Sequence, residues 1–304
     1  MIMLLLFLFM PLYGQKIANE KCQEYSKEVY QVAHDPFPKR FGRVAKPIST
    51  CAIFENPLII GGTVTRPREF PHMAVIGFGP TENEPLAWFC GGSLISEKHV
   101  LTAAHCSKSY RGPPQKAKLG ATTLNETGYN VQEIAISKCV VHPKFETPVK
   151  YHDIAILFLK TSVRFTEFVR PACLNTKMSN FSIATATGFG KTSFCSSTIS
   201  NSLLKVDLNY VRKKDCKKLI KLQKYEAPKG ITDQMLCFGN LKGGNDTCEG
   251  DSGGPIQVIL DQPYCMYNII GVTSFGQFCG MANSPAIYTN VKNYISWIED
   301  TIWK

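Results

Sequence analysis

Short runs of apolar residues recur through most of this chain and set the first expectation about its fold. From residue 59 onward these runs are separated by clusters of Gly, Pro, Asn and Lys, which interrupt regular structure. Several short strand-like runs at such spacing predict an all-β sandwich or barrel. The runs that stand out are MAVIGF, KHVLTA, QEIAISKCVV, DIAILFL, SIATATGFG, IQVIL, YNIIGVTSF and AIYTNV.

The two flanks of this region follow other patterns. The C-terminal stretch VKNYISWIEDTIW repeats apolar residues at helical spacing, so we expect a terminal helix there. Residues 15–58 are polar, contain two cysteines and have no sustained apolar period. This composition predicts a loosely structured prosegment.

Residues 1–14, MIMLLLFLFMPLYG, form an almost unbroken apolar run. The run is too short to cross a bilayer, which needs about 20 residues. We interpret it as a secretory signal peptide; a disordered or buried N-terminus is the alternative. No other stretch is long and apolar enough to be a membrane span, so we expect a secreted, extracellular protein.

Composition supports an extracellular globular protein. The chain has 304 residues, of which 44% are hydrophobic, enough to build one large core or two small ones. Its 12 cysteines are even in number and follow the signal peptide, which favours disulfides. There is no Cys-x-x-Cys pair to suggest a zinc site, and we expect no cofactor.

The formal net charge is +10, and much of it lies in RKKDCKKLIKLQK at residues 212–224. Such a run can bind acidic glycans or membranes. More often it is the solvated face of a helix, and Leu219, Ile220 and Leu222 provide an apolar face to bury. We expect the solvated face, with weak acidic-glycan binding as the alternative, and no nucleic-acid partner.

Three short motifs point to chemistry. LTAAHC carries His105, DIAIL carries Asp153, and GDSGGP carries Ser252. Taken alone, each has an ordinary explanation as a strand-end histidine, a turn aspartate or a loop serine. Together, in the order His, Asp, Ser, they resemble the chymotrypsin-like (S1) serine proteases over residues 59–304.

The resemblance implies two six-stranded antiparallel β-barrels with the site in the cleft between them. A serine hydroxyl is a poor nucleophile at neutral pH and needs an adjacent base. By resemblance His105 is that base, Asp153 orients its ring, and the N–H groups of Gly250 and Ser252 form the oxyanion hole. The expected activity is a serine endopeptidase acting on protein substrates through an acyl-enzyme. A non-catalytic protease homologue is the competing hypothesis.

The resemblance also implies activation by cleavage. The mature chain of the family starts with a sequence like Ile59-Ile60-Gly61-Gly62. Cleavage between Leu58 and Ile59 frees an ammonium group, which is expected to pair with Asp251. Because Leu58 is apolar, we expect an activating protease that prefers apolar residues. Lys39-Arg40 is a dibasic alternative site, but cutting there does not create the required Ile terminus.

Substrate preference is expected to depend on a pocket. By resemblance Asp246 lies at its base and pairs with Arg or Lys of the substrate. Ser274, Phe275 and Gly276 form the next wall, and the Ala286 methyl narrows the pocket. The alternative for Asp246 is a solvated Asn-Asp turn.

The resemblance assigns four disulfides, namely Cys90–Cys106, Cys216–Cys237, Cys248–Cys279 and Cys51–Cys173, the last as a tether for the prosegment. Four cysteines remain, with three pairings open to them: Cys22, Cys139, Cys195 and Cys265. The N-x-S/T sequons at Asn125 and Asn180 are expected to be glycosylated. Ala121 stands where calcium-binding relatives have a carboxylate, so we expect no metal.

The stretch NPLIIGGTVTRPREFPHMA is similar to insect proteases of extracellular cascades, such as those of hemolymph. Those proteins carry a six-cysteine clip domain, whereas residues 15–58 hold only two cysteines, so we expect no full clip domain. A venom or salivary role is equally compatible, and protein inhibitors are expected partners.

Overall fold

A computed structural model describes residues 14–32, 47–52, 63–177, 181–192, 196–244, 246–276 and 279–304. The predicted signal peptide lies outside these residues except for Gly14. No helix in the described part of the chain is long and apolar enough to cross a membrane.

Six antiparallel strands close the first β-barrel. Their order is β4-β5-β6-β9-β8-β7, and β7 pairs back to β4. The apolar runs MAVIGF and QEIAISKCVV coincide with β4 and β8, which confirms both as strands. The strands are β4 (Met73–Phe78), β5 (Ala87–Ser96), β6 (His99–Thr102), β7 (Pro114–Leu119), β8 (Gln132–Val141) and β9 (Ala155–Leu159).

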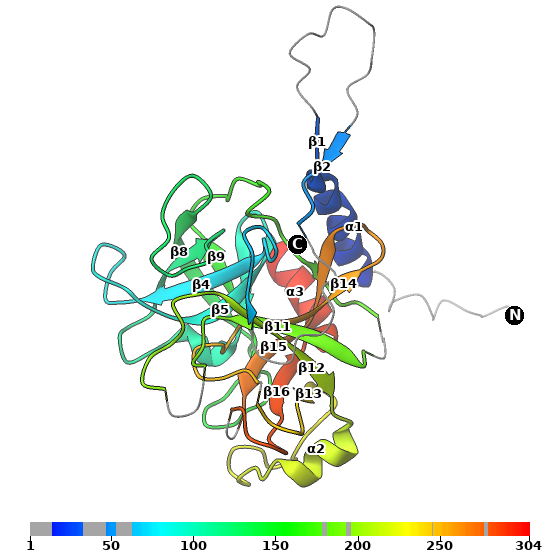
Figure 1. The fold of residues 1–304 in the computed structure, drawn as a ribbon. Helices are drawn as coiled ribbons and strands as arrows, with labels where there is room; N and C mark the ends of the chain where they lie inside the picture. Colours follow the sequence, from blue (N-terminus) through cyan, green and yellow to red (C-terminus); the bar gives the residue numbers. More distant parts are fainter. Residues whose placement is uncertain are drawn as a thin grey trace, which may run out of the picture.

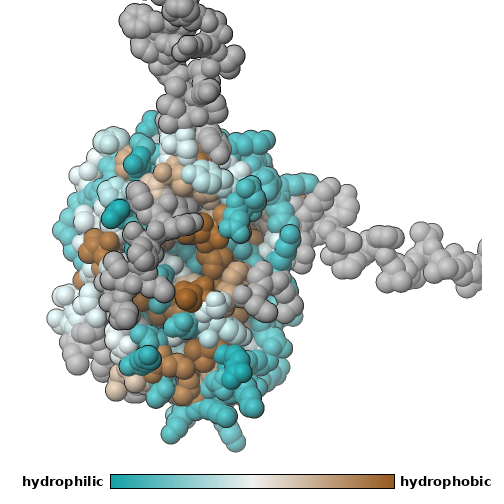
Figure 2. All heavy atoms as spheres, turned by 45° about the vertical axis from the view of Figure 1, so that its right-hand side comes forward, coloured by the Kyte–Doolittle hydropathy of each residue, from teal (hydrophilic) through white to brown (hydrophobic). Residues whose placement is uncertain are grey.

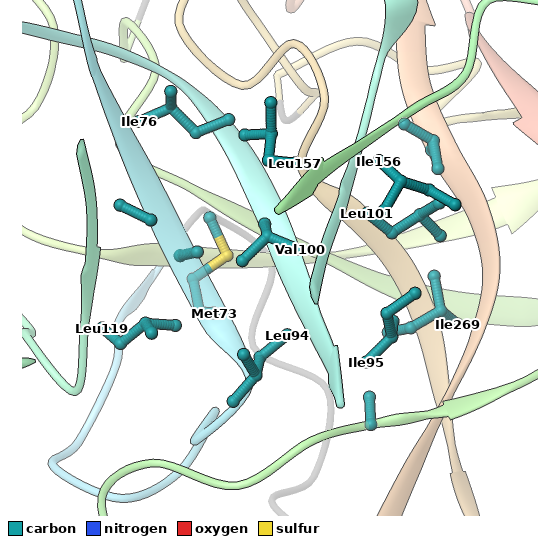
Figure 3. Close-up of a cluster of buried hydrophobic side chains, with 14 of the residues drawn as sticks. Met73, Ile76, Leu94, Ile95, Val100, Leu101, Leu119, Ile156, Leu157 and Ile269 are labelled. Carbon is teal, nitrogen blue, oxygen red and sulfur yellow. The ribbon is translucent and has the colours of Figure 1, made fainter. Parts of the chain in front are cut away.

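Branched aliphatic side chains fill the interior of this barrel (Figure 3). Leu94, Val100 and Leu157, from β5, β6 and β9, are fully buried. Burying one such side chain stabilises the fold by about 1.5–3 kcal/mol. This packing holds β6 against β9 in a register that places Thr102 opposite Ala155.

The second barrel is built in the same way from the C-terminal half of the chain. Its order is β15-β14-β11-β12-β13-β16, and pairing of β15 with β16 closes the ring. The prediction of two six-stranded antiparallel barrels is confirmed. The strands are β11 (Ile183–Gly188), β12 (Leu204–Tyr210), β13 (Met235–Gly239), β14 (Pro255–Leu260), β15 (Met266–Phe275) and β16 (Ala286–Asn290).

Shorter elements complete the architecture. β3 (Thr63–Val64) pairs with β12, and β10 (Cys173–Leu174) runs parallel to β15. The predicted terminal helix begins as a 3-10 turn at Val291–Tyr294 and continues as α3 (Ile295–Ile302). α2 (Lys213–Leu219) projects from the second barrel at the lower end of the molecule (Figure 1).

The N-terminal segment differs from the prediction of a loose prosegment. Gly14–Ser26 form a helix, α1, followed by a 3-10 turn at Lys27–Val29 and the strand pair β1 (Tyr30–Val32) and β2 (Pro47–Ser49). Figure 1 shows α1 in dark blue beside α3 in red. Ala18, Cys22, Tyr25 and Val29 recur at helical spacing and are buried. The prediction was wrong here because Ala and Cys are weak hydrophobic signals.

Polar contacts fix α1 on the protease barrels as well. The Ala18 N–H donates to Glu299 Oε1 of α3 at 2.8 Å, and this carboxylate is fully buried. The Tyr25 hydroxyl donates to Glu97 Oε2 at 3.1 Å. The helix therefore packs as part of the same globule.

The predicted Cys51–Cys173 disulfide is wrong. Instead Cys22 of α1 pairs with Cys173 of β10, and Cys51 pairs with Cys265 between β14 and β15. Their Cα–Cα separations of 5.0 and 5.9 Å suit disulfides. The reason is that α1 packs with Cys22 beside β10, so Cys22 bonds to Cys173. Cys51 then bonds to Cys265 in the turn between β14 and β15. Two disulfides, rather than the one expected, therefore link the N-terminal segment to the barrels.

Candidate active site

His105 and Asp153 meet because of the β6–β9 register. His105 follows the end of β6 and Asp153 precedes the start of β9, so both lie just beyond the Thr102–Ala155 pair. Asp153 Oδ2 lies 2.8 Å from His105 Nδ1, and its Oδ1 accepts the backbone N–H of His105 at 2.9 Å. The two bonds hold the imidazole in one orientation, with 36% of its side chain exposed to the cleft.

The Asp153 carboxylate is almost fully buried. Burial by itself raises the pKa of a carboxyl group. The facing His105 imidazole and hydrogen bonds from His105 and the Ser274 hydroxyl outweigh burial and lower the pKa of Asp153 below its ordinary value. The group is therefore an anion at neutral pH that can accept a hydrogen bond from Nδ1 of His105.

Ser252 lies in the turn before β14, at the junction of the two barrels. Its carbonyl accepts the N–H of Gly91 of β5 at 2.7 Å. A side chain on Gly253, whose φ is +78°, would collide with Thr102 and Gly91, so only glycine permits this approach. No hydrogen bond joins the hydroxyl of Ser252 to His105 within the described residues; such bonds are often formed only with substrate bound.

Two backbone N–H groups near Ser252 are unused. Those of Gly250 and Ser252 donate to no acceptor among the residues that the structure describes. Gly250 has φ +101°, and a Cβ there would lie 2.9 Å from the Cα of Gly190. Free N–H groups held by such a turn can donate hydrogen bonds to a developing oxyanion.

A cavity of about 200 Å³ opens next to Ser252. All five residues predicted to bind substrate line it, which brings them together with the serine. They come from the ends of β15 and β16 and from the loop before Ser252. The cavity is lined by Lys191, Asp246, Thr247, Cys248, Glu249, Ser252, Thr273, Ser274, Phe275, Gly276, Cys279 and Ala286.

Asp246 is the acidic group inside this cavity. Burial raises its pKa to about 7, the nearby Asp251 adds to the rise, and the N–H groups of Thr247 and Gly280 oppose it. A buried carboxyl without a cation is costly when ionised. The site is thus suited to a ligand that brings a positive charge.

Gly276 and Ala286 face each other across the cavity. A Cβ added to Gly276 would lie 3.8 Å from the Ala286 Cβ. Ala286 is buried at the start of β16, so its methyl narrows the cavity without being free to move aside.

Asp251 is buried among loops of the second barrel. Its oxygens accept N–H groups from Gly190 at 2.7 Å and Cys248 at 2.8 Å. Burial, only partly offset by these bonds, raises its pKa to about 6. A cavity of about 120 Å³ lies beside the carboxylate. No cationic side chain among the described residues pairs with it.

Sequence reasoning missed one pair at the rim of the larger cavity. Lys191 Nζ lies 2.5 Å from Glu249 Oε2, and Lys191 N–H donates to the Glu249 carbonyl. The only sign of this ion pair in the sequence is that Glu249 directly precedes Gly250. A second hollow of about 190 Å³ lies on the other side of His105, lined in part by Phe145, Val149 and Lys150.

Two predicted disulfides brace the site. Cys90–Cys106 anchors the turn that carries His105, and Cys248–Cys279 ties two walls of the cavity. Cys216–Cys237 is present as well, joining α2 to β13. Cys139 forms no disulfide with any described cysteine, and Cys195 lies outside the described residues. In the described chain one group could resemble a metal site, Cys90, His105 and Cys106, but its sulfurs are bonded to each other.

Several predicted positions are not described by the structure. Leu58 and Ile59 of the cleavage site and Asn180 of the second sequon lie outside the described residues. Asn125 is exposed in a turn, where a glycan has room.

Comparison with known proteins identifies the family of this chain. The model of the family described as Trypsin matches residues 59–298. Serine protease snk of Drosophila melanogaster is 42% identical over 297 residues, which cover 96% of this chain and 66% of that protein. Serine protease Hayan of the same species is 33% identical over 77% of this chain and 37% of its own length. Venom serine protease Bi-VSP of Bombus ignitus is 36% identical, over 78% and 66%.

The chain therefore spans less than two thirds of the length of these relatives. The resemblance to chymotrypsin-like proteases, and to insect members in particular, is confirmed.

Proposed function

This chain belongs to the trypsin family of serine proteases, and on that basis we propose that it is a secreted zymogen. Cleavage between Leu58 and Ile59 activates it, and the active enzyme hydrolyses protein substrates after Arg or Lys. The division into a signal peptide at 1–14, a prosegment at 15–58 and a protease domain from residue 59 is part of the proposal. The main observation that supports the proposal is that Asp246 and Ser252 line the same cavity.

The chemical step uses Ser252, His105 and Asp153. Ser252 Oγ attacks the carbonyl carbon of the scissile bond while His105 Nε2 takes the hydroxyl proton. The same imidazolium then protonates the leaving amine, which departs and leaves an acyl-enzyme. Water, deprotonated by His105, hydrolyses the ester and restores Ser252. The bond from Asp153 to Nδ1 supports this assignment, because it keeps Nε2 free to accept the proton.

The oxyanion that forms at each step needs donors. The unused N–H groups of Gly250 and Ser252 support this role, since neither is committed to another acceptor among the described residues. Loss of one such donor costs a factor of about 10²–10³ in rate.

Preference for Arg or Lys follows from Asp246. A cationic side chain entering the cavity replaces the missing counter-charge and relieves the cost of a buried carboxylate. Phe275, Gly276 and Ala286 limit the width of the side chain that can enter.

Activation couples cleavage to this site through Asp251. The free ammonium group of Ile59 can pair with the Asp251 carboxylate, which adjoins Ser252 in the chain. The buried carboxylate, which has no cationic partner among the described residues, and the cavity beside it support this switch. Because Leu58 precedes the cut, the activating enzyme is expected to prefer apolar residues.

The proposal is tested by covalent labelling of the activated protein. Replacing residues 54–58 with Asp-Asp-Asp-Asp-Lys allows enteropeptidase to release the Ile59 terminus. A fluorophosphonate probe should then add one label, at Ser252, with the uncut protein and the Ser252→Ala protein unlabelled. Labelling of another serine would contradict the nucleophile, and equal labelling before and after the cut would contradict the zymogen. A native active chain that begins after Lys39-Arg40 would contradict the cleavage site.

A further inference from the structure

Over half of the excess positive charge lies in one short segment. Residues 212–231 contain eight Lys or Arg side chains and only two acidic ones, so they supply six of the ten net charges. Charge that is packed so closely is costly to maintain without an opposing partner.

The helix α2 explains how these charges are displayed. Cys216 is fully buried and bonded to Cys237, and it packs with Val211 and Ile220 in one hydrophobic cluster. The opposite face of the helix carries Lys214, Lys217 and Lys218, all exposed. One face therefore anchors the helix to the barrel, and the other presents only positive charge.

Internal ion pairs neutralise a minority of the cations. Arg212 pairs with Asp215 at 2.8 Å, and Lys213 pairs with Asp233 at 2.5 Å. Five exposed lysines have no ion pair with any residue that the structure describes. They define what we call the basic surface: Lys214, Lys217, Lys218, Lys224 and Lys229.

The spacing of these lysines keeps them coupled. Along a helix Lys214 and Lys218 are about 6 Å apart, at 1.5 Å per residue. This is shorter than the Debye length of about 8 Å at physiological salt, so their mutual repulsion is not screened away. An anion with several charges along its length removes that repulsion.

The basic surface continues to the loop next to the catalytic aspartate. The Lys229 N–H donates to the hydroxyl of Tyr151 at 2.8 Å, and that hydroxyl donates to the carbonyl of Gly230. The N–H of Lys150 donates to the Glu226 carbonyl at 2.8 Å, and Lys150 borders the hollow beside His105. The loop that carries Lys229 thus adjoins the loop that carries Lys150, whose ammonium pairs with Glu226 at 3.8 Å.

We propose that the basic surface is a binding site for a linear sulfated polysaccharide. Such a chain repeats sulfate and carboxylate groups along its length and binds through charge with little need for apolar contact. A folded protein partner would use buried aromatic or aliphatic anchors. Within 212–231 the only large hydrophobic side chain that is strongly exposed is Tyr225.

The surface view agrees with this choice. Figure 2 is turned about the vertical axis, so its lower end is again the end where Figure 1 places α2. The residues protruding there are coloured as hydrophilic, whereas the hydrophobic patches lie higher on the same face. The lower end of this face is thus hydrophilic.

The test uses the uncut Ser252→Ala protein, so that its outcome is independent of the proposed protease activity. Binding of a heparin-derived dodecasaccharide is measured by calorimetry at 150 mM NaCl and at several higher salt concentrations. We expect binding that weakens steeply with salt. Lys217→Gln, Lys218→Gln and Lys224→Gln combined should raise Kd by roughly tenfold or more, since each lost charge contact removes part of the binding free energy.

A matched control removes the same net charge elsewhere. Lys98, Lys108 and Lys242 are exposed and have no ion pair in the described chain, and their Gln variants combined should leave Kd within about twofold. Equal weakening by both triple variants would overturn the proposal, because binding would then reflect net charge alone. Absence of binding to wild type, or equally tight binding of polyglutamate of matched charge, would also overturn it.

Discussion

At the scale of single residues, the proposed specificity depends on the partly buried carboxyl group of Asp246. The pKa of Asp246 is raised to about 7 in the empty cavity. At a pH below this value the group is mostly neutral and offers a cationic ligand little attraction. Below this pH a ligand cation must therefore displace a proton from Asp246 as it binds.

This linkage predicts how binding of a small cation depends on pH. In Ser252→Ala protein cut at Ile59, the Kd of benzamidine should be constant above about pH 7.5 and rise about tenfold per pH unit below about 6.5. Calorimetry between pH 5 and 8.5 measures it, with Asp246→Asn as the control that removes most of the affinity. A Kd that does not change with pH across this range would contradict the assignment of Asp246.

The methyl group of Ala286 makes a second residue-scale prediction. Ala286→Gly widens the cavity and should raise kcat/KM for Arg substrates by about fivefold or more relative to Lys, because a single methyl in a pocket is worth about 1–3 kcal/mol. Gly276→Ala places a second methyl 3.8 Å from the first, at ordinary contact distance, and should lower kcat/KM for both. Unchanged Arg-to-Lys ratios in Ala286→Gly would show that the methyl does not limit the pocket.

Residues in local motifs were more predictable than residues whose partners arrive from another strand. His105, Asp153 and Ser252 stand in short stretches whose neighbours are informative. The residues on either side of Lys118 in the sequence give no such information. Lys118 is a buried lysine whose ammonium donates to the Leu124 carbonyl at 2.6 Å and pairs with Glu133 at 3.0 Å. Only the strand register supplies that environment, so sequence alone gives no reason to expect it.

At the scale of elements, α1 is the unusual feature. It is held by a hydrophobic stripe, by the buried Glu299 carboxylate and by the Cys22–Cys173 disulfide, while Cys51–Cys265 holds the strand pair that follows. Each disulfide constrains a long loop, which typically stabilises a fold by about 2–4 kcal/mol. The segment is thus expected to stay with the protease after cleavage.

The double tether predicts a simple pattern on activation. After cleavage at Ile59, wild type and Cys22→Ala/Cys173→Ala should both remain one covalent species without reductant, because Cys51–Cys265 suffices. Removing all four cysteines should separate the two chains on a denaturing gel. Cys139→Ala is the control and should behave as wild type. Release of the prosegment from the double variant would show that the second disulfide does not form.

Strand and helix predictions succeeded where apolar periodicity was strong. β4 and β8 coincide with continuous runs, and α3 follows a clear helical repeat of large side chains. The strand β7, PQKAKL, contains two lysines, so it has no clear apolar alternation. The buried face of α1 includes Ala18 and Cys22, so its helical repeat is not visible in the sequence alone. Of the four predicted disulfides only Cys51–Cys173 was wrong, and for the same reason, since that pairing depends on where α1 docks.

At the scale of the whole molecule, the interface between the two barrels contains a buried histidine. His72, just before β4, is hydrogen-bonded to Gln257 of β14, and Gln257 donates to Thr187 at 3.2 Å. Burial lowers the pKa of His72 to about 4. The neutral ring is therefore part of the folded state, whereas the unfolded chain binds a proton near pH 6.5.

This difference predicts the acid sensitivity of the fold. Because the unfolded state binds more protons, His72 contributes stability that is complete above about pH 6.5 and is lost as pH falls toward 4, up to about 3 kcal/mol. Urea unfolding of Ser252→Ala at pH 7.5 and 4.5 measures the loss. His72→Gln, which keeps a hydrogen-bonding side chain, should lose less than its parent between these pH values. An equal loss in both proteins would assign the effect to other groups.

The central claim is most directly tested by peptide hydrolysis. Protein cut after residue 58, with its Ile59 terminus verified by sequencing, is assayed on matched Arg, Lys and Phe substrates beside Ser252→Ala. We expect cleavage after Arg or Lys, little after Phe, and none in the variant. Absence of hydrolysis by the verified Ile59 protein, or activity that persists in Ser252→Ala, would contradict it.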